Sequence, residues 1–251
     1  MKAIIIAAGS STRLGNLTEE IPKGLLKINN KSILEIQIQQ FKKKNISKII
    51  IITGPYHEKF HFDDVHLIND KEYKEHDVLG SLMIAKSEMN SEIITSYSDI
   101  VFENSVLDSL LEFKGDIGLA VDLDWEKKYF NRTEHPKSQA DNVVIENNKI
   151  IKIRKNISDY EKTQKIGEFL GLMKLSEHGT EVFLKKYNKL IQTHRGKFQD
   201  AESLKKAYLT DLIQELIDSG NEVSPIFVKG KWSEIDTPQD LENARKTWIN
   251  Q

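Results

Sequence analysis

The feature that most constrains the fold is an apolar, Ile-rich run at residues 3–8, which ends at Gly9. A short run without polar residues is typical of a strand that is buried on both faces of a parallel sheet. The residues from Gly9 to Thr12 are small, so their backbone N–H groups can approach an anion closely, and Arg13 adds a fixed positive charge. The sequence therefore predicts a buried strand that leads into a phosphate-binding loop.

Two common phosphate-binding loops do not fit this spacing. The loop of nucleoside triphosphatases needs Gly-Lys-Ser/Thr at its second glycine, but Gly15 is followed by Asn16. The dinucleotide fingerprint needs a second glycine two residues after the first, and that residue is Ser11. The loop therefore belongs to neither class.

The loop instead resembles the nucleotidyltransferase motif A-A-G-x-x-x-R-L, which is followed by P-K about ten residues later. Here the matching residues are Ala7-Ala8-Gly9, Arg13-Leu14 and Pro22-Lys23. This motif is typical of the NTP-transferase superfamily, which includes the sugar-phosphate nucleotidylyltransferases and the small phosphocholine, aminoethylphosphonate and phosphoglutamine cytidylyltransferases. The common pattern has glycine where this chain has Ser11. The resemblance implies that the loop backbone and Arg13 hold the triphosphate, through Ala7, Ala8, Gly9, Ser10, Ser11, Thr12 and Arg13, and that Lys23 contacts the transferred or acceptor phosphate.

Strands and helices alternate along the rest of the chain. A strand, a helix and a second strand within the first fifty-three residues predict a right-handed βαβ unit and hence a parallel sheet. We expect an α/β fold with a Rossmann-like, mixed and mostly parallel sheet flanked by helices. Strands are predicted at 3–8, 25–28, 48–53, 65–69, 92–97, 116–122, 169–175, 223–228 and 231–235, and helices at 32–44, 78–89, 104–113, 177–189, 203–219 and from Pro238 onward.

The middle of the chain has a different residue composition. Residues 124–141 are aromatic and charged without a clear period, which indicates a loop or an insertion. Two β runs around Asn147-Asn148 then predict an antiparallel hairpin. We expect a single nucleotidyltransferase domain over residues 1–251, with a small antiparallel, acceptor-binding insertion at roughly 122–170.

Composition excludes several classes of function. The 36 Lys and Arg residues nearly balance 38 Asp and Glu residues, which does not favour a nucleic-acid partner. The absence of cysteine excludes disulfides, thiolate metal sites and a cysteine nucleophile. The apolar start is too short for a secretion signal, and no run approaches the roughly 20 apolar residues of a membrane helix. We expect a cytoplasmic monomer or homodimer without membrane contact.

Two aspartates at predicted strand ends are candidate metal ligands. Asp99 follows one strand and Asp236 follows another, at the edge where open α/β sheets bind ligands. Mg²⁺ in a nucleotide site takes one or two carboxylates plus phosphate oxygens. Either aspartate could instead serve as a helix cap, but the resembled cytidylyltransferases bind magnesium at the matching positions.

The nucleobase and the reaction are assigned from the same resemblance. It places the strand-to-helix region around Gly80 and Ser81 against the base, implies CTP as the nucleotide, and puts Ser98 at the nucleotide. Lys155 joins Arg13 and Lys23 as a third candidate cation for the α-phosphate. Because an acceptor phosphate with a second pKa of about 6 is already ionised at neutral pH, the reaction needs cations more than it needs a base.

The acceptor site is predicted around aromatic and acidic residues. Trp125, Tyr129, Phe130 and Trp232 could form an aromatic wall for a cation, although clustered aromatics are as often packing. Arg132 leaves room for an acceptor with its own carboxylate. The candidate acceptor-binding residues are Asp124, Trp125, Arg132, His135, Glu168 and Asp211.

One literal motif match points elsewhere. Residues 57–61 read H-E-x-x-H, the zinc-protease helix motif, but that motif needs a long helix and a third ligand. Gly54-Pro55 precede it and another strand follows closely, so we interpret it as a surface turn of helix.

Three functions remain open at this point. The first is Mg²⁺-dependent transfer of CMP from CTP to a small zwitterionic phosphate or phosphonate, with release of pyrophosphate and a role in cell-surface polysaccharide or capsule modification. The second is a sugar-1-phosphate nucleotidylyltransferase, which would use the same loop. The third is a nucleotide-binding module without turnover, suggested by Ser11 at the position of the usual glycine.

Overall fold

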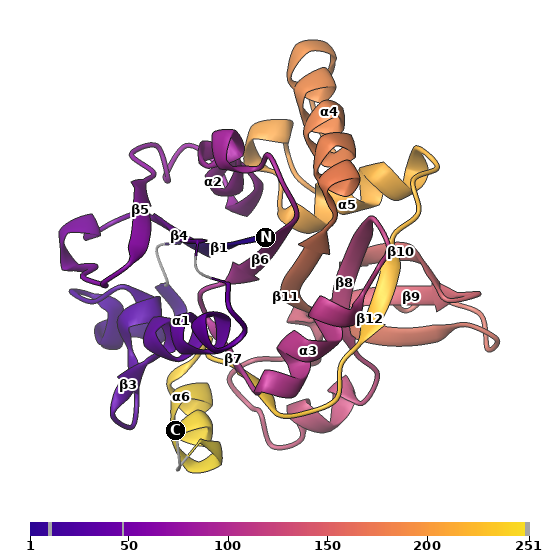
Figure 1. Cartoon of the computed structure of the whole chain (residues 1–251). Coiled ribbons are helices and arrows are strands. Elements are labelled where there is room, and N and C mark those ends of the chain that lie inside the picture. Colours follow the sequence, from indigo (N-terminus) through magenta and orange to yellow (C-terminus); the bar gives the residue numbers. More distant parts are fainter. Residues whose placement is uncertain (10–11, 47, 249–251) are drawn as a thin grey trace.

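The computed structural model describes residues 1–9, 12–46 and 48–248, and it is organised around a nine-stranded sheet (Figure 1). One part of this sheet is purely parallel. In it, β1 (Lys2–Ala7) lies between β4 (Lys48–Thr53) and β6 (Ile93–Tyr97), and β5 (Val65–Asn69) pairs with the outer side of β4. The predicted strand at the start of the chain and the βαβ unit are therefore confirmed.

The other part of the sheet is mixed. The long strand β11 (Lys165–Leu175) is antiparallel to β6, β8 (Ile117–Asp122) and β9 (Asp141–Glu146). Beyond them, β12 (Ser224–Phe227) is parallel to β8, and β10 (Lys149–Lys155) is antiparallel to β9. Within this sheet β10 and β11 run against β1 and the other strands run with it, so the expected mixed, mostly parallel sheet is confirmed.

The predicted hairpin is present, and its turn explains why it forms. Asn147 and Asn148 join β9 to β10 with φ of 49° and 60°. Two consecutive residues with positive φ are typical of a tight type I′ hairpin turn, in which asparagine is favoured. Two small sheets complete the described strands: β2 (Lys27–Ile28) with β3 (Lys31–Ser32), and β7 (Ile100–Phe102) with β13 (Trp232–Glu234).

Helices cover both faces of the sheet (Figure 1). Their boundaries mostly follow the predicted ones, with capping boxes at Ser32 and Thr237. Two helices differ. The helix predicted at 78–89 ends at Ile84, and a separate 3-10 turn follows at Lys86–Glu88. In the helix predicted at 203–219, Ser203 caps only a short 3-10 turn and the α-helix begins at Leu209. The α-helices are α1 (Ile33–Lys43), α2 (Val78–Ile84), α3 (Asn104–Glu112), α4 (Glu177–Thr193), α5 (Leu209–Asp218) and α6 (Pro238–Thr247).

Alternate side chains of β1 enter two different hydrophobic cores, as the period of a strand requires. Ala3 and Ile5 pack with buried residues of α1 and α3 on one face of the sheet. Ile4 and Ile6 pack with α2, α4 and α5 on the other face. The apolar composition of this strand therefore follows from burial on both faces.

A third core links the two ends of the chain. Leu14, from the segment after the predicted phosphate loop, is buried with Ile235 and with Leu241 of α6. Leu14 follows Arg13, and Ile235 precedes Asp236. This packing therefore brings two charged candidate site residues together, although they are far apart in sequence.

Close packing also fixes the end of β4. A Cβ at Gly54 would lie 2.3 Å from the carbonyl oxygen of Ala8, so a residue with a side chain cannot occupy this position without displacing the start of the loop. The H-E-x-x-H segment after it forms a three-residue 3-10 helix, His57–Lys59, as the surface-turn interpretation predicts. No helix in the described ranges is long and apolar enough to cross a membrane.

Candidate active site

A large cavity of about 1010 Å³ opens at the carboxyl ends of the parallel strands β1 and β6. This is the edge at which α/β sheets bind ligands. It brings together predicted residues from the whole length of the chain. Those that line it are Ala7, Ala8, Gly9, Arg13, Lys23, Ser81, Ser98, Asp99, Lys155, Glu168 and Asp236.

The predicted loop is described in part. Ser10 and Ser11 lie outside the described residues, and only the backbone of Thr12 is described, as the first residue of a 3-10 segment. Gly9 lines the cavity, and a Cβ there would meet no atom within 4 Å. The described part of the loop therefore lies beside open space, as a phosphate-binding backbone requires.

Two cations and two carboxylates meet at one side of the cavity. The Arg13 guanidinium lies 2.7 Å from Asp236 Oδ2. Lys23 Nζ donates to Asp99 Oδ2 at 3.0 Å and also to Asp236 Oδ1. The backbone reinforces this arrangement, because Ile235 N donates to the Asp99 carbonyl oxygen at 2.8 Å. The four residues therefore form one charged cluster.

Electrostatics favour the ionised forms of Asp236 and Lys23. Burial alone would raise the pKa of Asp236, but the hydrogen bond from His135 and the charges of Lys23 and Arg13 hold that pKa well below its usual range. Burial would lower the pKa of Lys23, but the charges of Asp99 and Asp236 raise it. Among the described residues Asp99 Oδ1 has no hydrogen-bond partner although it is buried. This carboxylate oxygen is therefore free to bind a cation.

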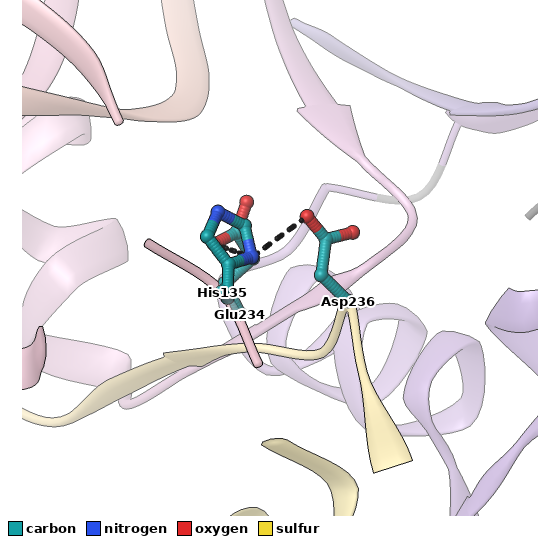
Figure 2. Close-up of side chains that lie close together, drawn as sticks. All are labelled: His135, Glu234 and Asp236. Atoms are coloured by element: carbon teal, nitrogen blue, oxygen red, sulfur yellow. Dashed lines mark ion pairs between the residues drawn. The ribbon is translucent and has the colours of Figure 1, made fainter. Parts of the chain in front are cut away.

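A second group of potential metal ligands adjoins Asp236. His135, Glu234 and Asp236 offer ligand atoms within 4.8 Å of one another, as Figure 2 shows. His135 Nδ1 lies 3.2 Å from Asp236 Oδ2 and 4.0 Å from Glu234 Oε2. Burial and the charge of Asp236 raise the pKa of Glu234. Glu234 lines the cavity, whereas His135 lies behind its wall.

Arg132 supports the site from behind. Its guanidinium forms a two-pronged ion pair with Asp240, with 2.6 and 3.0 Å contacts, and lies 2.9 Å from Glu234 Oε2. Asp240 Oδ2 in turn accepts the backbone N–H of Asp236 at 3.1 Å. The Arg132 side chain is only 7% exposed and does not line the cavity. Arg132 is therefore committed to protein carboxylates. This differs from the expectation from the sequence, in which Arg132 was open to a carboxylate of the acceptor.

One end of the cavity is built around a buried carboxylate. Asp70 is fully buried and accepts the Ser81 hydroxyl at 2.8 Å, and His76 Nε2 lies 3.2 Å from it. A Cβ at Gly80 would lie 2.4 Å from the His76 ring, so glycine is needed for His76 to occupy this position. Gly80 itself does not line the cavity, whereas His76 and Ser81 do.

The other end is lined by charged residues of three adjacent strands. Strand register places Lys155 of β10 opposite Asp141 of β9, and Glu168 lies on the neighbouring strand β11. Burial raises the pKa of Asp141 to about 7, even though Lys155 lowers it. Burial and the charge of Glu234 raise the pKa of Glu168 to about 8.

Glu168 is the predicted acceptor residue that the structure supports most directly. Its side chain is buried and accepts the Tyr129 hydroxyl at 2.6 Å through Oε1. Among the described residues no hydrogen-bond partner reaches Oε2. A carboxylate oxygen in this state is suited to a positively charged ligand that enters the cavity.

Other predicted acceptor residues lie away from the cavity. Asp124 is exposed and pairs with Lys127, and Asp211 caps α5 by accepting the backbone N–H of Tyr208 at 2.7 Å. Trp125 packs on Tyr129 in a small separate core. Of the four aromatics proposed as a wall, only Trp232 lines the cavity, and Phe130 is 82% exposed.

Sequence reasoning missed four residues near the cavity. Asp141 and Glu234 line it. Glu234 lies within the strand predicted at 231–235, whereas Asp141 is the first residue of β9 and falls in the segment that we interpreted as a loop. His76 lies four residues before Gly80, in the region assigned to the base, and it lines the cavity. Asp70 follows β5 directly, so its position at a strand end was also readable.

The fold and this cavity define an α/β nucleotidyltransferase. A family model, the MobA-like NTP transferase domain, matches residues 3–128, about half of the chain. The chain therefore belongs to this family, and its expected membership of the NTP-transferase superfamily is confirmed.

Similar proteins extend the likeness over the rest of the chain. The chain is 27% identical over 253 residues to the CTP:phosphoglutamine cytidylyltransferase of Campylobacter jejuni, which covers 96% of this chain and 98% of that protein. It is 37% identical over 108 residues to the choline-phosphate cytidylyltransferase of Streptococcus pneumoniae, which covers 41% of this chain and 47% of that one.

A solved structure of the Streptococcus pneumoniae CTP:phosphocholine cytidylyltransferase has the same fold. It superimposes with a TM-score of 0.75 and 22% identity, and the match covers 98% of each chain. The expected nucleotidyltransferase fold, including the mixed part of the sheet, is therefore confirmed.

Proposed function

We propose that the protein is a Mg²⁺-dependent cytidylyltransferase, which transfers CMP from CTP to a small acceptor carrying a phosphate or phosphonate and a positively charged group. The observation that carries this proposal is the shared cavity of Arg13, Lys23, Asp99 and Asp236. Had these residues faced different cavities, only an ordinary α/β domain would remain. The likeness to CTP-dependent cytidylyltransferases over nearly the whole chain supports cytidine as the base.

Cations around the triphosphate would provide most of the catalysis. Two anions must approach each other, and fixed positive charges in a partly buried site offset their repulsion. We assign this role to Arg13 and Lys23, with the N–H groups of the loop after β1 as further donors. Lys155 also lines the cavity and would assist as a third cation.

Asp99 and Asp236 are the residues that would hold Mg²⁺. Oxygen ligands suit this ion, and the unpartnered Asp99 Oδ1 fits such a role. When bound, the ion would neutralise charge on the phosphates of the nucleotide. Lys23 donates to both aspartates and also lines the cavity, so its ammonium lies beside the two candidate ligands.

The reaction needs no side-chain base. An oxygen of the acceptor phosphate would form a bond to the α-phosphorus of CTP while the bond from that phosphorus to the pyrophosphate oxygen breaks. With a second pKa of about 6, the acceptor phosphate is already largely ionised at neutral pH. Pyrophosphate leaves, and a CDP-linked product remains.

The acceptor's positive group would be held by Glu168, with Asp141 close by. Both carboxyls line the cavity, and burial raises the pKa of each. A cation brought next to them would favour their ionised forms and gain a charge-assisted hydrogen bond. Phosphocholine, 2-aminoethylphosphonate and phosphoglutamine are acceptors of this chemical type.

We also propose that residues 1–251 form one nucleotidyltransferase domain, in which the segment at roughly 122–170 recognises the acceptor. The placement of Asp141, Lys155 and Glu168 on β9, β10 and β11 supports the assignment of acceptor recognition to this segment. A monomer and a homodimer are both compatible with a cavity built from one chain.

The test is pyrophosphate release from CTP with Mg²⁺ and a panel of acceptors: phosphocholine, 2-aminoethylphosphonate, phosphoglutamine, and glucose- and mannose-1-phosphate. Asp99→Asn is the matched inactive control. Turnover with one of the first three supports the proposal. Turnover only of sugar phosphates with UTP, GTP or dTTP would identify a sugar nucleotidylyltransferase, and CTP binding without any turnover would indicate a binding module.

A further inference from the structure

Gln37 is a fully buried amide on α1 that contacts the turn carrying Asp99. Its Nε2 donates to the carbonyl oxygens of Tyr97 at 2.8 Å and Ile100 at 2.7 Å. Its Oε1 accepts the Ser96 hydroxyl at 2.9 Å. Both amide hydrogens and the amide oxygen therefore have partners.

The two carbonyl groups bound by Gln37 flank the Ser98–Asp99 turn. Tyr97 is the last residue of β6 and Ile100 is the first residue of β7. The turn is also held by Ser98 N, which donates to Ile6 O at 3.2 Å, and by the Asp99 carbonyl, which accepts from Ile235 N. Gln37 thus provides the link between this turn and α1.

An amide is the group this position requires. One –NH₂ supplies two donors in a fixed plane, and the Ser96 hydroxyl fixes which end of the amide faces the carbonyls. Methionine has a similar length but no donor, and an ionised glutamate offers only acceptors. A buried amide is costly unless it is fully bonded, so packing alone would favour an apolar residue here.

We propose that Gln37 is a positioning residue for the proposed nucleotidyl transfer: it fixes the turn so that the Asp99 carboxylate points at Lys23 and the cavity. This inference rests on the proposed function, because Asp99 is assigned there as a metal ligand. Gln37 does not line the cavity and touches no substrate. Its effect would reach the reaction only through the orientation of Asp99.

The same helix supplies a matched control. Gln40 lies one turn further along α1 and is 4% exposed, but it is directed to a different pocket, lined also by Lys43 and Asn104. Its Oε1 has no hydrogen-bond partner among the described residues. Gln40→Met therefore reports on the loss of a buried amide from α1 without a change at the Asp99 turn.

The experiment compares Gln37→Met, Gln37→Glu and Gln40→Met with wild type. We measure kcat, the acceptor KM and the half-saturating Mg²⁺ concentration by pyrophosphate release, and the Kd of Mg²⁺–CTP by calorimetry. Both Gln37 variants should lower kcat about 10- to 100-fold, because small displacements of catalytic groups have effects of this size. They should also raise the Mg²⁺ requirement and the Kd, with the acceptor KM within about twofold of wild type. Gln40→Met should match wild type.

Two results would overturn the inference while leaving the proposed function intact: wild-type kcat and Mg²⁺ dependence in Gln37→Met, or an equal loss in Gln40→Met. If Gln37→Met does not fold, Ser96→Ala is measured instead. It removes the hydroxyl that donates to the Gln37 amide oxygen and that also lies 3.0 Å from the Tyr97 carbonyl oxygen. An unchanged Mg²⁺ dependence in that variant would also reject the positioning role. Wild-type protein that neither turns over nor binds Mg²⁺–CTP would reject the proposed function itself, and this inference with it.

Discussion

Replacing Glu168 with glutamine should stabilise the fold above about pH 7 while it weakens acceptor binding. Burial raises the pKa of this carboxyl to about 8, from the 4.5 of an exposed glutamate. Between these two values the unfolded chain has released the proton and the native chain has kept it. The free energy of unfolding therefore falls as the pH rises from about 4.5 to 8, and the loss is complete above pH 8.

The magnitude follows from the size of the shift. At about 1.4 kcal/mol per pKa unit, ionisation of Glu168 lowers the stability of the wild-type protein by roughly 3 kcal/mol at pH 7 and by nearly 5 kcal/mol above pH 8. Glutamine has no such pH dependence. Its amide oxygen can still accept the Tyr129 hydroxyl, but its –NH₂ replaces an oxygen without a partner, at a pH-independent cost of about 1–3 kcal/mol.

The assay is urea unfolding of wild type and Glu168→Gln at pH 5, 6, 7, 8 and 9. The stability of the variant relative to wild type should rise with pH by a few kcal/mol across this range. Glu126→Gln is the matched control, because it makes the same change at a side chain that is 63% exposed. Equal pH dependence in wild type and Glu168→Gln would refute the argument from burial.

The same substitution tests the acceptor assignment. A charge-assisted hydrogen bond contributes about 1.5–3 kcal/mol, so its loss should raise the KM of an ammonium-bearing acceptor roughly 10- to 150-fold. The KM for CTP should stay within about twofold, because Glu168 lies at the other end of the cavity from Ser81. An unchanged acceptor KM would remove Glu168 from the acceptor site.

Three further predictions concern the nucleotide side of the cavity. Asp99→Asn and Asp236→Asn should each lower the rate of pyrophosphate release at least 100-fold, and normal rates in either variant would exclude that aspartate from the metal site. Chelation of Mg²⁺ should stop pyrophosphate release until Mg²⁺ is restored. Lys23→Met should lower kcat more than it changes the KM for CTP, because the ammonium is assigned to the transferred phosphate. A change in the KM for CTP alone would indicate that Lys23 only binds the nucleotide. Gly80→Ala should lower the free energy of unfolding in urea by about 1–3 kcal/mol, because the new Cβ would lie 2.4 Å from the His76 ring. Wild-type stability in this variant would show that the His76 ring can move.

The fold was largely predictable because local pattern and burial agree along most of the chain. The run at 3–8 is apolar at every position because β1 is buried on both faces, and the Asn147-Asn148 pair fixes its hairpin through positive φ. The start of α5 was not predictable in the same way. Ser203 is a good cap, but it caps a 3-10 turn, and the true helix start is set by Asp211, which accepts the Tyr208 N–H.

The site was predictable where a motif or a strand end marks the residue. Arg13, Lys23, Asp99 and Asp236 line one cavity, as the sequence led us to expect. Arg132 shows the limit, because an arginine within an acidic, aromatic segment gives no sign of which carboxylate it pairs with. Its partner Asp240 lies 108 residues away, and only the tertiary fold brings the two side chains together.

The core formed by Leu14, Ile235 and Leu241 also has a consequence for how the enzyme is made. During synthesis the loop after β1 leaves the ribosome more than two hundred residues before Asp236 does. Until then Arg13 and Lys23 lack the carboxylate that they share. A nascent chain can therefore build most of its sheet early, but the charged cluster is complete only when the segment that carries Asp236 packs against the segment after β1.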